Sequence, residues 1–289
     1  MINDTLKNKK RTLSVEVFPP KKEEEFPELY ETLTALANLQ PDFISVTYGA
    51  LGSNSKSTAK IASYIKQELG IDALAHLTST TLDESSLLKS LQDFKSLGID
   101  NILALRGDKP KDKSIEEFNQ RNYLYASDMI SAIRKNSDNL CIAGACYPEK
   151  HIEAKSMEDD LLHLKEKVDA GTDFLITQLF FENSRLYEFL NQTEAIGIQI
   201  PIIAGIMPIT SVSQIKTTLE MSHAHIPLNL RKIFEKYQDN PLDFKKAGMD
   251  YAILQILDLM SQGVSGIHLY SMNKYDVSSF IFQNVLSTL

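Results

Sequence analysis

The sequence is poor in cysteine: among 289 residues it has only Cys141 and Cys146. They lie five positions apart on one expected strand, and an odd offset puts side chains on opposite faces of a strand. This argues against a disulfide between them, and without further Cys or His residues nearby they make a poor zinc site. We expect two small buried side chains in a reducing compartment.

Long apolar runs and an excess of positive charge are also missing. No apolar window of about 18 residues occurs, so no transmembrane helix is expected, and residues 1–15 lack the apolar core of a secretory signal. The net charge is −8, and we interpret the single basic cluster, KNKKR at 7–11, as a solvated tail. These absences argue against a nucleic-acid-binding protein and predict a cytoplasmic one.

Three common functional motifs are absent from the chain. It contains no G-x-G-x-x-G, the fingerprint of a dinucleotide-binding βαβ unit, no P-loop and no H-E-x-x-H zinc motif. The missing G-x-G-x-x-G argues against the dinucleotide-binding version of a doubly wound sheet.

The chain does contain short apolar, β-branched runs that recur at regular intervals. Each is almost continuously apolar rather than alternating, as in parallel strands covered on both faces. The expected strands are 13–18, 43–49, 73–78, 101–107, 141–147, 174–181, 200–207 and 266–272.

Helical patterns separate these runs and carry their own start and stop signals. Pro27 falls in the first turn of the pattern after the first run, and Asp83 is placed to cap the helix after the third. Gly70 and Gly98 are placed to end the second and third helices. The segment 223–262 adds further helical material before the last run.

Strand and helix alternate eight times, which predicts an α/β fold of the (β/α)8 TIM-barrel type with extra helical material before the last strand. We expect one domain over residues 1–289. A doubly wound open sheet is the alternative, but it usually has fewer strands.

In such a barrel the active site forms at the carboxyl ends of the strands. Several polar residues stand at these ends: Glu16, Thr47, Tyr48, His76, Thr78, Arg106, Asp108, Tyr147, Gln178 and Tyr270. As a group they hold carboxylates, an arginine, an amide, a histidine and hydroxyls, which together are unusual for a purely structural edge.

Glu16 lies between Val15 and Val17, so its side chain opposes theirs. If the valines pack on the helices, Glu16 points into the barrel, where burial would raise its pKa into the range of a general acid. The alternative is a solvated surface carboxylate.

The other candidates also have structural alternatives. In LRGD at 105–108, either Arg106 and Asp108 form a local ion pair in a turn, or Gly107 lets the backbone approach a ligand while Asp108 faces the mouth. Gln178 is either a hydrogen-bonded interior amide or a ligand contact. His76, taken alone, is more often a core histidine.

Ten segments follow one another from about residue 13 to 275: VEVFPP, FISVTYGA, AHLT, LRGD, YASD, CYPEKHIEAKS, DLLHLKEKVDAG, ITQLFF, GIMPI and HLYSMNK. In this order and spacing they resemble the motifs of the 5,10-methylenetetrahydrofolate reductases, FAD-dependent barrel enzymes that make 5-methyltetrahydrofolate. The resemblance is to the bacterial type, and it implies one catalytic FAD-binding domain over 1–289 without a regulatory domain.

The resemblance also implies roles for individual residues. Glu16 matches the general acid, Asp108 the aspartate near the flavin and the bound pterin, and Gln178 the amide that contacts folate and nicotinamide. The implied FAD contacts are Thr47, Tyr48, Ala50, His76, Arg106, Gly107, Asp108, Ala126, Tyr147, His151, Ala154, Asp160, His163 and Lys167. The implied substrate contacts are Asp108, Gln178, Gln214, Tyr270 and Lys274. No metal is implied.

Three residues depart from the family pattern. His163 stands where relatives carry Asn, and Glu166 where some carry Arg, so we expect Glu166 not to contact the diphosphate directly. Lys274 replaces an Arg, which keeps the charge but loses the bidentate fork and predicts looser binding of the folate tail.

The implied chemistry has two half-reactions at one flavin face. NADH or NADPH reduces the flavin, and methylenetetrahydrofolate then opens to an iminium cation that accepts hydride, giving methyl groups for methionine synthesis. A homodimer or homotetramer is implied. Other classes remain open: a related flavin barrel dehydrogenase, a non-catalytic electron-relay flavoprotein subunit, or a colourless non-redox barrel.

Overall fold

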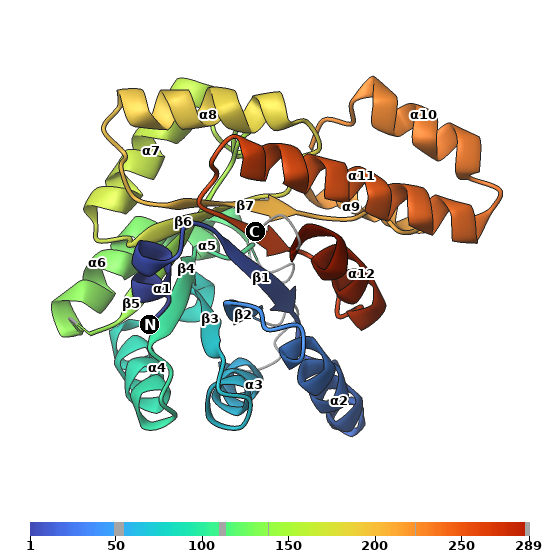
Figure 1. Ribbon diagram of the computed structural model, residues 1–289. Coiled ribbons are helices and arrows are strands. Elements are labelled where there is room, and N and C mark those ends of the chain that lie inside the picture. The colour runs from blue at the N-terminus through green and yellow to red at the C-terminus, as the bar shows by residue number, and fades with distance from the viewer. Residues whose placement is uncertain (49–54, 110–113, 138, 223, 287–289) are drawn as a thin grey trace.

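The computed structural model describes residues 1–48, 55–109, 114–137, 139–222 and 224–286. In these residues eight parallel strands pair in sequence order and close into a barrel (Figure 1), which confirms the predicted fold. The strands are β1 (Thr12–Val17), β2 (Phe43–Val46), β3 (Asp72–Thr78), β4 (Asn101–Leu105), β5 (Cys141–Cys146), β6 (Phe174–Thr177), β7 (Ile202–Ile206) and β8 (Gly266–Leu269).

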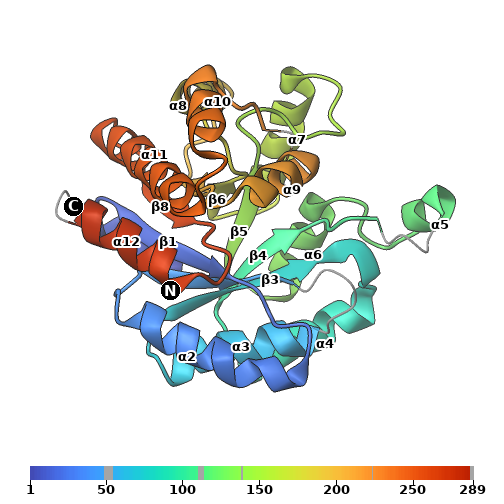
Figure 2. The same cartoon turned by 90° about the vertical axis from the view of Figure 1, so that its right-hand side faces the viewer.

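Helices surround this barrel, as the turned view in Figure 2 shows. The α-helices are α1 (Ile2–Asn8), α2 (Phe26–Ala37), α3 (Ser55–Gln67), α4 (Glu84–Ser96), α5 (Ile115–Asn119), α6 (Ala126–Asn136), α7 (Met157–Asp169), α8 (Asn183–Ala195), α9 (Val212–Ser222), α10 (Leu228–Tyr237), α11 (Pro241–Ser261) and α12 (Tyr275–Val285). Two short 3-10 helices, η1 (Glu23–Glu25) and η2 (Ser79–Thr81), follow β1 and β3.

The predicted helix signals are found where the sequence placed them. Pro27 lies in the first turn of α2, and the Asp83 carboxylate accepts the backbone N–H of Ser86 at 2.7 Å to cap α4. Gly70 and Gly98 both have a φ of 69°, the left-handed conformation that favours glycine after a helix. Local chemistry therefore fixes where these helices begin and end.

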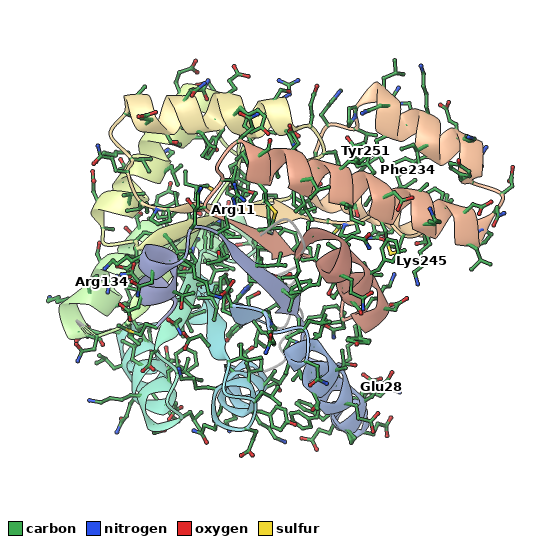
Figure 3. All side chains as sticks on the ribbon, viewed as in Figure 1. Arg11, Glu28, Arg134, Phe234, Lys245 and Tyr251 are labelled. Atoms are coloured by element: carbon green, nitrogen blue, oxygen red, sulfur yellow. The ribbon has the colours of Figure 1, made fainter. Side chains whose placement is uncertain are left out.

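The extra helical material before β8 is also confirmed, as α10 and α11. These two helices pack together through Phe234 and Phe244, whose rings stack with centroids 5.4 Å apart. Figure 3 labels Phe234 on α10 and Tyr251 on α11. The hydroxyl of Tyr251 on α11 donates to the Phe181 carbonyl at 2.6 Å, so the pair is anchored to the segment after β6.

Some predicted strands were too long at their carboxyl ends. β6 ends at Thr177 rather than at residue 181, although Leu179, Phe180 and Phe181 are all buried. They pack as a loop against core clusters outside the strand. An apolar run reports burial rather than strand geometry, so the pattern could not separate the strand from the buried loop that follows it.

The strands divide their side chains between the barrel interior and the layer under the helices. Val15 and Val17 belong to the outer cluster with helix residues such as Leu33, whereas Phe43 and Phe174 fill the interior. The neighbours of the valines, Ser14 and Glu16, therefore face inward. Likewise Cys141 packs inside and Cys146 outside, and both are free thiols, as predicted.

Residues 7–11 are largely exposed, as expected of a solvated segment, but they are not a tail. They form the end of α1 and its connection to β1, and Ile2 of α1 is fully buried in the interior cluster at the amino-terminal end of the barrel. The Ile2 N–H donates to Asn101 Oδ1 at 3.0 Å, and Lys9 forms an ion pair with Asp42. A seven-residue helix has too few apolar positions to stand out as a periodic pattern.

Candidate active site

Glu16 and His76 meet inside the barrel near the carboxyl ends of β1 and β3. Glu16 Oε2 lies 3.6 Å from His76 Nε2, and this buried nitrogen has no hydrogen-bond partner among the described residues. Burial raises the pKa of Glu16 to about 8 and lowers the pKa of His76 to about 3. The inward orientation expected for Glu16 is thus confirmed, and burial favours the neutral form of both groups.

His268 lies deeper in the barrel and was missed by the sequence reasoning. Its Nδ1 is 2.7 Å from the hydroxyl of Ser14 and its Nε2 is 3.0 Å from the hydroxyl of Ser45, while the ring stacks on Phe43. Burial lowers the pKa of His268 to about 3. Its position in the last apolar run, GIHLYSM, could have marked it as an inward-facing polar residue.

Tyr270 follows β8 and completes the interior polar group. Its hydroxyl donates to the Thr177 carbonyl at 2.8 Å. A Cβ on Gly205 would lie 2.6 Å from the Tyr270 ring, so only glycine at this β7 position leaves room for it. Burial, followed by the charge of Glu16, raises the pKa of Tyr270 well above its ordinary value. Tyr270 and Glu16 therefore lie close enough inside the barrel for their charges to interact.

A cavity of about 360 Å³ lies beside the carboxyl ends of β4 and β5, the first turn of α6 and one side of α7 along most of its length. Eight predicted cofactor contacts line it: Arg106, Ala126, Tyr147, His151, Ala154, Asp160, His163 and Lys167. The structure thus brings together residues that are up to 61 positions apart, counted from Arg106 to Lys167. Residues that sequence reasoning had not selected also line it: Ala104, Leu105, Tyr125, Ser127, Ala145, Glu153, Lys155, Asp159 and Glu166.

Paired and buried charges shape this cavity. Both terminal nitrogens of Arg106 donate to the Glu153 carboxylate, so the expected local alternative, an Arg106–Asp108 pair, is not the main contact. Hydrogen bonding to Glu153 raises the pKa of Arg106. Glu153 lies within CYPEKHIEAKS, two positions after a predicted contact, and this proximity was the available signal.

Two further contacts fix the cavity wall. Lys167 Nζ donates to the Ala145 carbonyl at 2.7 Å, and burial lowers the pKa of this lysine. The Asp160 carboxylate accepts the His151 N–H at 2.8 Å and so holds the loop between β5 and α7. Asp160 therefore stabilises the loop through this hydrogen bond, in addition to its implied contact with FAD.

The residues present fit a flavin dinucleotide. Arg106, Lys155 and Lys167 supply cationic donors for a diphosphate, and small side chains at Ala104, Ala126, Ala145 and Ala154 leave space between the strand ends and the helices. His76, another implied FAD contact, does not line this cavity, but its buried Nε2 has no hydrogen-bond partner among the described residues.

Other predicted cofactor contacts lie outside this cavity. Thr47 and Tyr48 follow β2 and are half-buried, and Asp108 is exposed just after β4. Ala50 lies outside the described residues. Gly107 has a φ of 81°, and a Cβ there would lie 2.3 Å from Thr80 Oγ1. Contact with the chain itself is therefore sufficient to require this glycine, without the ligand approach that the sequence reasoning invoked.

Two predicted folate contacts meet at one threonine. Lys274 Nζ donates to Thr210 Oγ1 at 2.9 Å, while Gln214 Oε1 accepts the Thr210 N–H at 2.9 Å. Gln178 lies just after β6 and its Oε1 accepts the N–H of Leu179, the next residue, at 2.9 Å. The structure thus pairs Gln214 with Lys274 and places Gln178 at another strand end.

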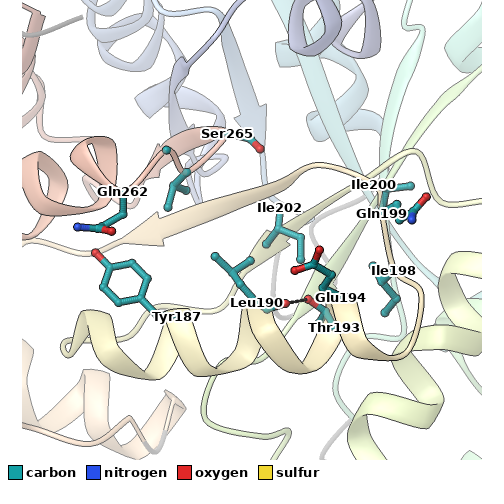
Figure 4. Close-up of a pocket in the computed structure, with 12 residues that line it drawn as sticks. Tyr187, Leu190, Thr193, Glu194, Ile198, Gln199, Ile200, Ile202, Gln262 and Ser265 are labelled. Atoms are coloured by element: carbon teal, nitrogen blue, oxygen red, sulfur yellow. Dashed lines mark hydrogen bonds between the residues drawn. The ribbon is translucent and has the colours of Figure 1, made fainter.

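A second cavity, of about 380 Å³, lies between the loops that enter β7 and β8 (Figure 4). Tyr187, Glu194, Gln199 and Gln262 are among the residues that line it. These loops are at the amino-terminal ends of the strands, opposite the polar residues described above. We therefore place the candidate active site at the carboxyl ends, where the titratable groups converge.

Comparison with known proteins agrees with this arrangement. The family model described as methylenetetrahydrofolate reductase matches residues 1–286. This chain belongs to that family. It is 35% identical over 266 residues to the 5,10-methylenetetrahydrofolate reductase of Escherichia coli (strain K12), covering 92% of this chain and 88% of that protein. The oxidoreductase and folate assignments expected from the resemblance are thereby confirmed.

A plant relative and a solved structure extend the comparison. The chain is 35% identical to methylenetetrahydrofolate reductase (NADH) 1 of Arabidopsis thaliana, covering 90% of this chain and 46% of that one. An uncharacterized Clostridium thermocellum protein, whose structure is described as binding two copies of 5-methyl-5,6,7,8-tetrahydrofolic acid, superposes over the full length of both chains with a TM-score of 0.74. At 16% identity this second likeness shows the fold alone.

Proposed function

We propose that this methylenetetrahydrofolate reductase uses bound FAD and NADH or NADPH to reduce 5,10-methylenetetrahydrofolate to 5-methyltetrahydrofolate. The observation that carries the proposal is Glu16, a carboxyl inside the mouth of the barrel whose pKa is raised to about 8 by burial. Such a group keeps its proton at neutral pH and can give it to a substrate nitrogen. The NADH named in the plant relative supports a nicotinamide reductant.

Glu16 would donate its proton to N10 of the folate, which opens the five-membered ring and leaves a cationic iminium. Asp108, exposed at the end of β4, would stabilise that cation by its negative charge. When bound, FAD supplies hydride transfer between the nicotinamide and the methylene carbon. His76, uncharged beside Glu16, adds no positive charge that would oppose the iminium.

The remaining predicted contacts would bind and orient the two substrates. Gln178 carries an amide that can both donate and accept, which suits alternating contact with folate and nicotinamide. Lys274 and Gln214, held together at Thr210, would face the glutamate tail of the folate. Arg106 and Lys167 would hold the FAD diphosphate in the cavity between α6 and α7.

We infer that the enzyme acts in the cytoplasm as a homodimer or homotetramer and supplies methyl groups for methionine synthesis. The oligomeric state and the metabolic role rest on the resemblance to the bacterial family, and the location rests on the charge and composition of the chain. Among the described residues no helix is both long and apolar enough to cross a membrane. Light scattering of the purified protein would measure the oligomeric state.

The first test is the colour and turnover of the purified protein. It should be yellow with FAD, NADH or NADPH should bleach the flavin anaerobically, and methylenetetrahydrofolate should restore the absorbance. Menadione should sustain turnover in place of folate. A protein that cannot be reconstituted with FAD refutes the proposal. One that binds FAD but is not reoxidised by folate belongs instead to the electron-relay class.

A further inference from the structure

Asn273, in the loop after β8, binds the backbone of Phe18 just past the end of β1. Its Oδ1 accepts the Phe18 N–H at 3.0 Å, and its Nδ2 donates to the Phe18 carbonyl at 3.0 Å. The side-chain amide of Asn273 therefore satisfies both backbone hydrogen-bonding groups of Phe18, which is 255 positions away in the sequence. Asn273 is not among the site residues inferred from the sequence.

The loop adopts an uncommon backbone to make this contact. Met272 and Asn273 both have a φ of 57°, in the left-handed region that non-glycine residues seldom occupy. Asparagine tolerates this conformation better than most residues, and its short amide lies close to the backbone. Strained conformations of this kind persist where the surrounding structure holds them, often at functional sites.

The position of the contact explains what it controls. The regular pairing of β1 with β8 ends at Val15 opposite Leu269. Glu16 therefore lies between the last regular pair and the Asn273–Phe18 contact. On its other side, β1 continues to pair with β2 through Val17 and the Thr47 N–H. Asn273 thus fixes the β8 side of the chain segment that carries the carboxyl.

We propose that Asn273 is a positioning residue for proton donation by Glu16. It holds the end of β1 so that the carboxyl stays inside the mouth, facing the substrate. The same loop carries Lys274, so the contact also sets the acid at a fixed place relative to the folate-tail cation. This inference rests on the proposed function, because it assigns Asn273 to the folate half-reaction.

Two variants separate the side-chain contact from backbone strain. Asn273→Gly removes the amide but suits the left-handed backbone, and Asn273→Asp keeps an acceptor for the Phe18 N–H while losing the donor to the Phe18 carbonyl. Gln40→Gly is the matched control, since Gln40 also has a positive φ, 56°, but lies in the loop between α2 and the amino-terminal end of β2.

The two half-reactions would be followed by flavin absorbance in a stopped-flow instrument. Asn273→Gly should slow reoxidation by methylenetetrahydrofolate about 10–100-fold, as expected for a misplaced reacting group, and leave reduction by NADH within about twofold. Asn273→Asp should be intermediate and Gln40→Gly normal. Because a loosened β1 end admits water, the alkaline limb of the reoxidation profile should move to lower pH.

Other results would overturn the inference. Wild-type reoxidation rates in Asn273→Gly, or equal slowing of both half-reactions, would show that Asn273 serves only stability. Intact flavin reduction in either variant demonstrates a folded protein. If the wild-type enzyme itself is not reoxidised by folate, the proposed function fails first and this inference fails with it.

Discussion

The carboxyl oxygen Oε2 of Glu16 lies 3.6 Å from Nε2 of His76 within the barrel. This is a contact between two groups that both favour the neutral form, not an ion pair. Burial produces both neutral states, because a low dielectric disfavours the carboxylate and the imidazolium alike. The acid therefore keeps its proton without a charged partner. This relationship leads to the first two predictions.

Replacing Glu16 by Gln should abolish folate reduction and spare flavin reduction. The amide keeps the shape of the side chain but cannot donate a proton to N10. We expect reoxidation by methylenetetrahydrofolate to fall about 10²–10⁴-fold, while NADH reduces the flavin at a normal rate. In wild type, reoxidation should decline above pH 8, as Glu16 ionises.

Glu149→Gln is the matched control for this activity measurement. Glu149 is also a partly buried carboxyl with a pKa raised by burial, but it accepts the His225 N–H in another loop. It should leave both half-reactions unchanged. Normal folate reduction by Glu16→Gln would refute the role of Glu16 as the acid.

The same Glu16→Gln change should stabilise the protein at alkaline pH. The pKa of Glu16 rises from 4.5 to about 8 on folding, so its contribution is fully present below pH 4.5 and is lost as pH rises through 8. We expect the unfolding free energy of the Glu16→Gln variant, relative to wild type, to increase by up to about 5 kcal/mol between pH 4.5 and 8, since each unit between the two pKa values is worth about 1.4 kcal/mol. Because 22% of the side chain remains exposed, this figure is an upper bound. Denaturant titrations at several pH values would measure it, and a pH-independent difference would contradict the burial argument.

His268 should make the protein sensitive to acid. Its pKa falls from 6.5 to about 3 on folding, so the unfolded chain binds its proton first and stability is lost as pH falls from 6.5 toward 3. His268→Gln should reduce this pH dependence by about 1.4 kcal/mol per pH unit. Phe43→Leu, which alters packing on the same ring, should lower stability and keep the slope. Equal slopes in His268→Gln and wild type would refute the assignment.

Much of this site was predictable, because the repeated strand–helix pattern predicts the barrel and the alternation of side chains along each strand predicts which residues face inward. The inward position of Glu16 followed from Val15 and Val17, and the family motifs gave eight of the residues around the cavity. The partners of these residues were not predictable. Glu153 and Asn273 act through contacts made by loops, whose paths no periodic pattern specifies.

Arg106 should be required for FAD retention. Its guanidinium lines the cavity and is held by Glu153, so it is positioned before a ligand arrives. Arg106→Ala should weaken FAD binding by at least about tenfold, the loss expected for hydrogen bonds to a charged group. Flavin fluorescence on dilution would report release. Arg185→Ala provides the control, because Arg185 pairs with Glu182 beside α8, away from the cavity, and equal affinity in the two variants would contradict the cofactor assignment.

Glu166 should weaken the hold on the flavin diphosphate. It lines the same cavity, and its Oε2 lies 3.2 Å from Nδ1 of His163. Its side chain is 66% exposed, so solvent screens its repulsion and the effect should be modest. Glu166→Gln should tighten FAD binding about twofold and Glu166→Arg about fivefold, with both gains shrinking as salt is added because the contribution is electrostatic. Glu188→Arg, which makes the same charge change on α8, should have no effect. Tightening by Glu188→Arg equal to that by Glu166→Arg would mean that overall charge, rather than the position of Glu166 in the cavity, sets the affinity.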